Sequence, residues 1–249
     1  MSHGPEDDAP GTSEGERPTG VWPPREPLDR LKVAAHRVGL WLRSLAVVAQ
    51  QSGPAVVWTG GTPLVIVPGV GNPTRSLGGR LLRELLASGV LPPGASVLDV
   101  GCGSGALTVE AARWARRVAA VDLRPEAVRC TRINVLLNRC DDRVVVRQGD
   151  LFEPVAGNRF DAVVCEPPVT RGGPGAAPND PEFLGRFARG LPAFLTSAGV
   201  AYLALTMGAG EDAGLAALEH AGLLCQPARR GSTFRAVVTV YRCTRHAHP

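Results

Sequence analysis

From residue 96 onward, apolar runs too short for helices alternate with longer segments in which apolar residues recur every three or four positions. This alternation is typical of a mostly parallel sheet with helices on both faces. The last two apolar runs flank a turn-like sequence at 230–233, and we expect them to form an antiparallel hairpin. The predicted strands are 96–100, 117–122, 143–149, 160–165, 199–206, 223–229 and 234–242, and the predicted helices are 105–115, 125–138, 181–195 and 211–221.

Two segments at the start of the chain differ from this pattern. Residues 1–27 are acidic and rich in proline and glycine, so we expect a disordered tail. Residues 28–51 carry apolar side chains at helical spacing, which predicts an amphipathic helix. This helix could be a lid over a substrate, a dimer contact or a plain packing helix.

A β-hairpin and a loop connect this helix to the alternating region. Two short apolar runs on either side of residues 59–62 predict the hairpin. A turn-rich loop at 68–75 and a helix at 76–88 follow, and such loops carry function or serve as connectors. We therefore expect a tail at 1–27, a helix and hairpin at 28–75, and a ligand-binding domain at 76–249.

Composition sets broad limits on the class of protein. With 249 residues, 44% of them hydrophobic, the chain can bury one domain core and a small extra element. There is no apolar run long enough to span a membrane and no signal-peptide pattern at the N-terminus. The six cysteines form no Cys-x-x-Cys pair, which indicates buried thiols in a reducing cytoplasm and no zinc site.

The charge distribution gives little support for a nucleic-acid partner. The formal net charge is +4. Residues 1–27 hold six acidic and two basic residues, so the rest of the chain has 25 basic and 17 acidic residues and a net charge of +8. The arginines are scattered, with no long basic run and few aromatic residues between them.

The most specific local signal is a glycine-rich turn at 97–105. A short apolar strand is followed by glycines at every second position, Gly101, Gly103 and Gly105, and then by a predicted helix. Glycine lets the backbone of a tight turn approach a ligand closely, and the N-terminus of the next helix offers unpaired N–H groups. An α/β sheet holds a nucleotide-like ligand in this way. An ordinary strand–helix turn is the alternative.

Two carboxylates narrow the expected ligand. Asp122 ends the next apolar run, about 20 residues after the first glycine, where an acidic residue can accept hydrogen bonds from ribose hydroxyls. Asp99 lies just before the turn, where a carboxylate is a poor neighbour for a pyrophosphate and a good one for a cation. A capping role is the alternative for Asp99. The pattern favours a ligand with a ribose and a positive charge.

Residues 64–243 resemble the class I S-adenosylmethionine (SAM) dependent methyltransferases. The resemblance rests on four elements in the family's order: the glycine loop at 99–105, the acidic strand end at 121–123, the third-strand element at 148–152 and the fourth-strand motif at 160–169. It implies a Rossmann-like, seven-stranded sheet with an antiparallel last strand, and SAM as cofactor.

The resemblance also implies which residues hold SAM. The glycine turn would approach its amino-acid moiety, and Asp99 would lie near its ammonium group, directly or through water. Asp122 would bind the ribose, and Asp150 would accept from the adenine amino group unless it is only a turn residue. The implied cofactor-binding residues are Asp99, Gly101, Cys102, Gly103, Ser104, Gly105, Asp122, Leu123, Asp150, Leu151 and Glu166.

The fourth-strand motif carries the expected chemistry. In the small-domain N-methyltransferases that this chain most resembles, it has Asn or Asp, two prolines, then Tyr or Phe. These enzymes methylate exocyclic base amines or protein glutamine amides. The polar side chain and the next carbonyl accept hydrogen bonds from the target N–H and so align its nitrogen. The limited φ of the prolines keeps that carbonyl fixed.

This chain has Glu166-Pro167-Pro168-Val169 at the motif. A glutamate could bind an ammonium and then act as acceptor or base once the amine loses a proton. Valine lacks the ring on which a flipped base or planar amide would stack. The predicted catalytic residues are therefore Glu166, Pro167 and Pro168. The alternative is a solvent-facing Glu166 beside prolines that only shape a turn.

These features predict a metal-free enzyme that methylates a small amine-bearing or polar metabolite, most simply on nitrogen and in secondary metabolism. One alternative is an rRNA or protein N-methyltransferase, which a basic surface around Glu166 would support. A second is a SAM-consuming cyclase or alkyl transferase that releases methylthioadenosine. A third is a non-catalytic SAM-binding module, which a buried Glu166 without an adjoining cavity would indicate. A homodimer is also compatible with the sequence.

Overall fold

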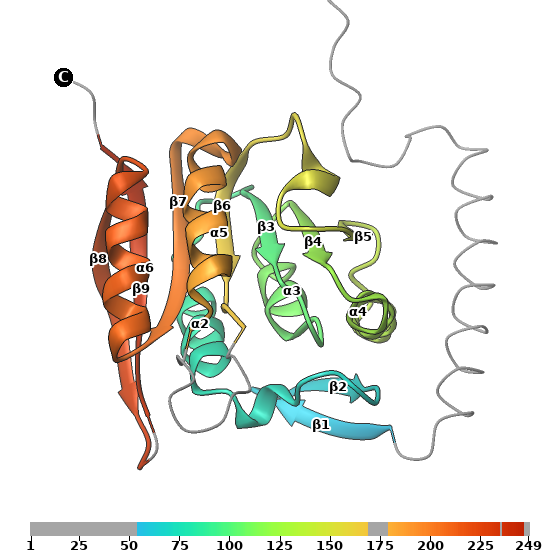
Figure 1. Ribbon diagram of the computed structural model, residues 1–249. Helices are drawn as coiled ribbons and strands as arrows, with labels where there is room; N and C mark the ends of the chain where they lie inside the picture. Colours follow the sequence, from blue (N-terminus) through green and yellow to red (C-terminus); the bar gives the residue numbers. More distant parts are fainter. Residues whose placement is uncertain (1–53, 169–178, 235, 247–249) are drawn as a thin grey trace, which may run out of the picture.

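The computed structural model describes residues 54–168, 179–234 and 236–246 (Figure 1). The predicted tail at 1–27 and the predicted helix at 28–51 lie outside the described residues, as does Val169. The described chain forms a seven-stranded sheet and a separate two-stranded hairpin. This architecture confirms the predicted Rossmann-like α/β fold. The division of the chain at residues 27 and 75 stays a prediction.

The large sheet has the strand order β5-β4-β3-β6-β7-β9-β8. The strands from β5 to β7 are parallel, and β9 runs antiparallel to both β7 and β8. The first strand of this sheet in sequence, β3, lies inside the sheet, and later strands are added on both sides of it. The strand order therefore reverses next to β3, and open α/β sheets bind ligands at such a switch point. The strands are β3 (Ser96–Val100), β4 (Arg117–Asp122), β5 (Val144–Gln148), β6 (Phe160–Cys165), β7 (Leu195–Thr206), β8 (Leu223–Ser232) and β9 (Val237–Arg245).

Helices cover both faces of this sheet because successive strand residues point to opposite sides. Val97 belongs to one buried cluster, which also contains residues of α2, α3 and α4, whereas Leu98 belongs to a second cluster with residues of α5 and α6. Ala162 and Val163 on β6 divide in the same way. The helices are α2 (Leu77–Ala87), α3 (Ala106–Ala111), α4 (Pro125–Leu137), α5 (Pro181–Phe194) and α6 (Ala209–His220). Among the described helices, none has the length and apolarity that a membrane span requires.

The N-terminal hairpin packs against the helices of the first face (Figure 1). Its strands are β1 (Ala55–Thr59) and β2 (Thr62–Ile66), as the sequence predicts. Leu64 and Ile66 are buried in the same cluster as α2, α3 and α4. The Asn134 side chain on α4 bonds both the amide and the carbonyl of Val65. The hairpin therefore fixes the start of the loop that leads into η1 (Pro73–Arg75) and α2.

The turn of the C-terminal hairpin lies about three residues later than the sequence indicates. β8 continues through Ser232, and Thr233 N–H donates to the Ala236 carbonyl at 2.8 Å. Two further features lie in this longer strand. A register shift lies between Pro227 and Arg229, and Gly231 lies against the Leu81 side chain of α2. Neither feature is visible in the local sequence pattern.

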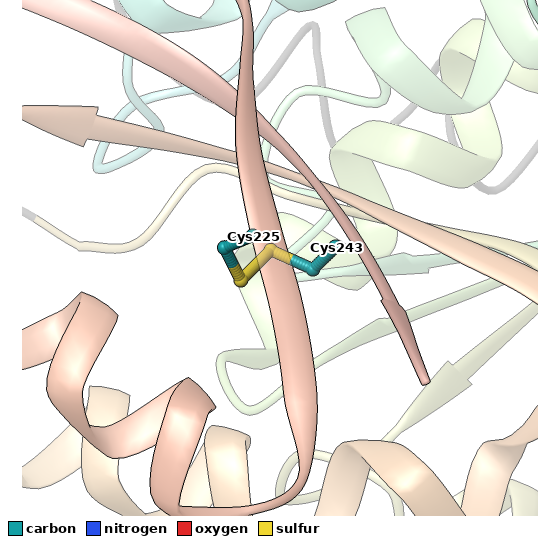
Figure 2. The surroundings of a disulfide bond; sticks show 2 residues. All are labelled: Cys225 and Cys243. Carbon is teal, nitrogen blue, oxygen red and sulfur yellow. A yellow bond between two sulfur atoms is a disulfide. The ribbon is translucent and has the colours of Figure 1, made fainter. Parts of the chain in front are cut away.

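The expectation of six thiols is wrong for two of the cysteines. Cys225 and Cys243 form a disulfide between β8 and β9 (Figure 2). Cys102, Cys130, Cys140 and Cys165 are buried thiols. The bonded pair is 18 residues apart in the chain but directly opposite in the β8–β9 register. Opposed residues of an antiparallel pair have close Cβ atoms. The bond thus depends on the strand register, which cysteine spacing does not reveal.

Candidate functional site

A cavity of about 750 Å³ lies where the parallel strands end. Its walls come from the residues after β3, β4, β5 and β6, from the loop before η1 and from the start of α5. Ligands bind in this position in open α/β sheets, at the carboxyl ends of the strands. The loop at 68–75 reaches the cavity through Gly69 and Gly71, and the Gly69 carbonyl accepts a hydrogen bond from Arg124 at 2.9 Å.

Of the three predicted turn glycines, Gly101 faces the cavity. It has φ +78°, and a Cβ placed there would meet no atom within 4 Å, so open space adjoins its backbone. Gly105 serves packing instead, because a Cβ there would lie 3.0 Å from Thr131 Cγ2 on α4. Gly103 N–H donates to Asp122 Oδ2 at 2.9 Å and so links the turn to the end of β4. The room beside Gly101 fits close approach by a ligand.

Cys102 and Ser104 support the turn from inside. Both are buried. The Thr131 hydroxyl is 3.2 Å from the Cys102 sulfur and 3.1 Å from the Gly103 carbonyl. Asn134 donates to the Ser104 carbonyl at 2.8 Å. These two predicted cofactor residues therefore hold α4 and the turn together and do not line the cavity wall.

Asp122 and Leu123, two of the predicted cofactor residues, line the cavity. The Asp122 carboxylate accepts from the amides of Gly103 and Arg124, at 2.9 and 3.0 Å. A carboxylate offers about four acceptor positions, so these two bonds orient Asp122 and leave positions for ribose hydroxyls. Leu123 is 64% exposed and presents an apolar surface next to Asp122, suited to the face of a purine.

Asp99, on β3, is a carboxyl group with a strongly raised pKa. Its side chain is fully buried, and Thr108 donates to Oδ2 at 2.5 Å. Within the described residues, Oδ1 has no hydrogen-bond partner. Burial raises the pKa of Asp99 to about 7 against the Thr108 hydrogen bond, and the charges of Asp122 and Glu166 add to the rise. A buried acceptor without a partner, behind the glycine turn, fits a cationic group in front of it.

The third predicted element places Asp150 and Leu151 at the cavity, and α5 adds two residues that the sequence did not indicate. Arg186 of α5 forms an ion pair with Asp150, and Phe183 lies on the same wall. Leu151 has φ +46°, a left-handed conformation that is uncommon outside glycine and typical of constrained positions in sites. The amphipathic pattern predicted the helix but not which side chains would reach Asp150.

The fourth-strand motif brings Glu166 and Pro168 to the cavity, with Pro167 buried between them. The Ser76 hydroxyl donates to Glu166 Oε1. Burial raises the pKa of Glu166, whereas the Ser76 hydroxyl, the Gly79 amide and the charge of Arg83 oppose the rise. Asp180 N–H donates to the Pro168 carbonyl at 3.3 Å. This bond holds the start of α5 next to the motif.

The cavity is acidic overall. Its lining includes five carboxylates and two guanidinium groups: Asp122, Asp150, Glu166, Asp180, Glu182, Arg124 and Arg186. A cleft lined mainly by one sign of charge attracts ligands of the opposite sign. This surface favours cationic groups and repels phosphate. No group of three or more potential metal ligands occurs within 54–168, 179–234 and 236–246.

The switch-point cavity, the glycine turn and the carboxylate at the end of β4 define a class I SAM-dependent methyltransferase fold, and Gly101, Asp122 and Asp99 fit a ribose-bearing, cationic cofactor. Residues 76–205 match the model of the family "Methyltransferase small domain". The match covers more than half of the chain, so the chain belongs to this family. Membership confirms the predicted class and its cofactor, SAM.

Comparisons with individual proteins give the same fold and a narrower sequence match. The chain is 41% identical over 87 residues to a ribosomal protein L11 methyltransferase of Bacillus cytotoxicus. That match covers 34% of this chain and 26% of the relative, so the chain spans about a quarter of the length of the curated relatives it matches.

Two solved structures share the fold. One is a ribosomal protein L11 methylase from Lactobacillus delbrueckii subsp. bulgaricus, with a TM-score of 0.53, 21% identity and coverage of 71% of this chain and 82% of that one. The other is described as a methyltransferase complexed with SAH, with a TM-score of 0.62, 15% identity and coverage of 78% and 56%.

Proposed function

We propose that this protein transfers the methyl group of SAM to an amine nitrogen of a protein substrate. The observation that supports this proposal best is the acidic cavity, which has the glycine turn and Asp122 on one side and Glu166 and Pro168 on the other. SAM supplies an electrophilic methyl group bound to a sulfonium. The protein's part is to hold SAM, to align the amine with the methyl group and to receive a proton, and alignment is a large part of such catalysis.

The cofactor-binding residues divide by chemistry. Asp122 accepts hydrogen bonds from the ribose, and Leu123 and Leu151 pack on the adenine beside Asp150. The backbone at Gly101 accommodates the amino-acid moiety, because a side chain there would occupy the open space. Asp99 compensates the ammonium charge from behind the turn, with Oδ1 as the acceptor left over by Thr108. Cys102, Gly103, Ser104 and Gly105 shape the turn.

Glu166 and the Pro167 carbonyl form the acceptor site for the amine. An amine arrives as an ammonium ion and must lose a proton before its lone pair can attack. The partly buried Glu166 carboxylate attracts the ammonium, and its raised pKa suits it to take the proton. The Pro167 carbonyl accepts a second N–H and fixes the direction of the lone pair. Pro168 closes the wall, with its own carbonyl bonded to Asp180.

Two observations favour a protein over the small metabolite that the sequence suggests. Curated relatives are named for methylation of a ribosomal protein. Five carboxylates around the cavity disfavour the phosphates of RNA and suit a side-chain or terminal amine. The cavity beside Glu166 also argues against a non-catalytic module. Kinship with ribosomal protein methyltransferases supports a cytoplasmic location, where protein substrates of this kind are made.

The substrate class is tested by following labelled methyl groups. The purified protein is incubated with SAM labelled in the methyl group and, separately, with stripped ribosomal proteins, total RNA or the small-molecule fraction of an extract. We expect acid-stable label in protein and equimolar S-adenosylhomocysteine. Label only in RNA or only in the small-molecule fraction would refute the protein substrate. Methylthioadenosine as the co-product would refute methyl transfer itself.

A further inference from the structure

The Glu166 side chain is held by the first turn of α2, which lies 90 residues earlier in the chain. The Ser76 hydroxyl donates to Glu166 Oε1 and accepts from Gly79 N–H at 2.9 Å. The three groups form a chain in which the amide polarises the hydroxyl and the hydroxyl bonds the carboxylate. A glutamate is one methylene longer than the Asp or Asn of the resembled motif, and this reach brings its carboxylate to Ser76.

The two glycines after Ser76 make room for the carboxylate. A Cβ at Gly78 would lie 2.8 Å from Glu166 Oε1, and a Cβ at Gly79 would lie 2.8 Å from Oε2. Each distance is shorter than a van der Waals contact. Glycine in a helix is less favourable than alanine by about 1 kcal/mol. Two adjacent glycines in one helical turn therefore have a steric reason here, which is the approach of Glu166 from β6.

From these contacts we infer that Ser76 is a positioning residue for Glu166, and that Gly78 and Gly79 are required to admit the carboxylate beside it. This role rests on the proposed function of Glu166 as the acceptor for the amine proton. Ser76 uses one of the about four acceptor positions of the carboxylate, so positions remain for a substrate N–H. The contact fixes the direction of the carboxylate and stabilises its charged form.

Charged groups from neighbouring elements act on the same carboxylate. Arg83, one turn further along α2, lowers the pKa of Glu166, and the Ser76 hydroxyl and Gly79 amide act in the same direction. Asp99 on β3 interacts with Glu166 as a like charge. The Cys165 thiol beside Glu166 has a pKa well above its usual range, so it is neutral. Without the Ser76 hydroxyl, fewer groups counteract the effect of burial on Glu166. We therefore expect the pKa of Glu166 to rise.

The test is a direct titration of Glu166 by NMR in full-length protein labelled with ¹³C at glutamate Cδ. The Glu166 signal is assigned by its absence in Glu166→Gln. In Ser76→Ala we expect the titration to move to higher pH, and in Ser76→Thr, which restores a hydroxyl, to return toward the wild-type midpoint. Ser88→Ala is the matched control, because Ser88 caps the other end of α2 and bonds the Leu85 carbonyl. An unchanged Glu166 midpoint in Ser76→Ala would overturn the inference.

Alanine at the glycines provides a second measurement. Gly79→Ala should displace the flexible carboxylate of Glu166. Both the ¹³C chemical shift of Glu166 Cδ and the midpoint of its pH titration should therefore change. Gly185→Ala in α5 makes the same change where the nearest atom is the end of the Arg189 side chain, at 3.4 Å, and should leave Glu166 unchanged. A Glu166 signal unaffected by Gly79→Ala would contradict the steric role of the glycines.

The outcomes separate this inference from the proposed function. If the midpoint does not move in Ser76→Ala while Glu166→Gln abolishes methyl transfer, the positioning role is wrong and the function stands. If the midpoint moves but Glu166→Gln retains full methyl transfer, the proposed role of Glu166 is wrong, and with it the catalytic meaning of Ser76.

Discussion

Replacement of Asp99 by asparagine should change how the stability of the protein depends on pH. Asp99 is fully buried, and burial raises its pKa from 3.8 to about 7. The folded protein therefore keeps the Asp99 proton over a pH range in which the unfolded chain loses it. Its contribution to stability is full below pH 3.8 and is lost as the pH rises through about 7.

The size of this effect follows from the pKa difference. Each pH unit between the two pKa values changes the free energy of unfolding by about 1.4 kcal/mol. From pH 5 to pH 8 the wild type should therefore lose roughly 3 kcal/mol through Asp99. Asparagine has no proton to lose. An amide at this position leaves a buried donor without a partner, which costs about 1–3 kcal/mol at every pH.

The assay is urea unfolding of the wild type and Asp99→Asn at pH 5, 6, 7 and 8. We expect the variant to be less stable at pH 5 and to gain on the wild type as the pH rises, until the two curves converge or cross near pH 8. Asp142→Asn is the control, because Asp142 is 57% exposed and its pairing is with the adjacent Arg143. A constant difference in the free energy of unfolding between Asp99→Asn and wild type across this range would show that Asp99 does not have a raised pKa in the folded protein.

Three further predictions concern cofactor binding and stability. Asp122→Ala should weaken binding of S-adenosylhomocysteine by roughly 100-fold in calorimetry, because it removes the two hydrogen bonds proposed to the ribose. The exposed Asp142→Ala should not weaken binding, and equal affinities of the two variants would exclude Asp122 from the cofactor site. Gly105→Ala should destabilise the protein by more than Gly157→Ala in thermal unfolding, since both glycines have similar positive φ but a Cβ meets Thr131 only at Gly105; equal losses would contradict the packing role. Reduction of Cys225–Cys243, which closes a loop of 18 residues, should lower stability by about 3 kcal/mol and leave S-adenosylhomocysteine affinity unchanged; a parallel loss of binding would show that the edge hairpin supports the cavity.

The sequence predicts the elements of this fold because each depends on local pattern. The strands 96–100, 117–122 and 160–165 occur as predicted, since buried parallel strands have continuous apolar runs. The glycine turn and Asp122 are also local signals, and the structure brings them together through Gly103 N–H.

Contacts between distant segments were not predictable from the same patterns. Arg186 contacts Asp150, 36 residues earlier in the chain, and Ser76 contacts Glu166, 90 residues later. Neither Arg186 nor Ser76 belongs to a local sequence motif. Gly105 does lie in a local motif, but the motif does not show its packing role. Its place in the motif indicated ligand contact, whereas the packing of α3 on α4 explains it. The acidic character of the cavity likewise depends on Asp180 and Glu182, which α5 brings to the site.

In the proposed reaction, Glu166 acts in methyl transfer and is not required to hold SAM. The most direct test compares Glu166→Gln with the wild type in two measurements on the same preparation: calorimetric affinity for S-adenosylhomocysteine, and release of S-adenosylhomocysteine from SAM in the presence of ribosomal proteins. We expect affinity within about twofold of wild type, a difference of roughly 0.4 kcal/mol, and loss of turnover. Full turnover in Glu166→Gln, or loss of cofactor binding together with turnover, would exclude this role of Glu166.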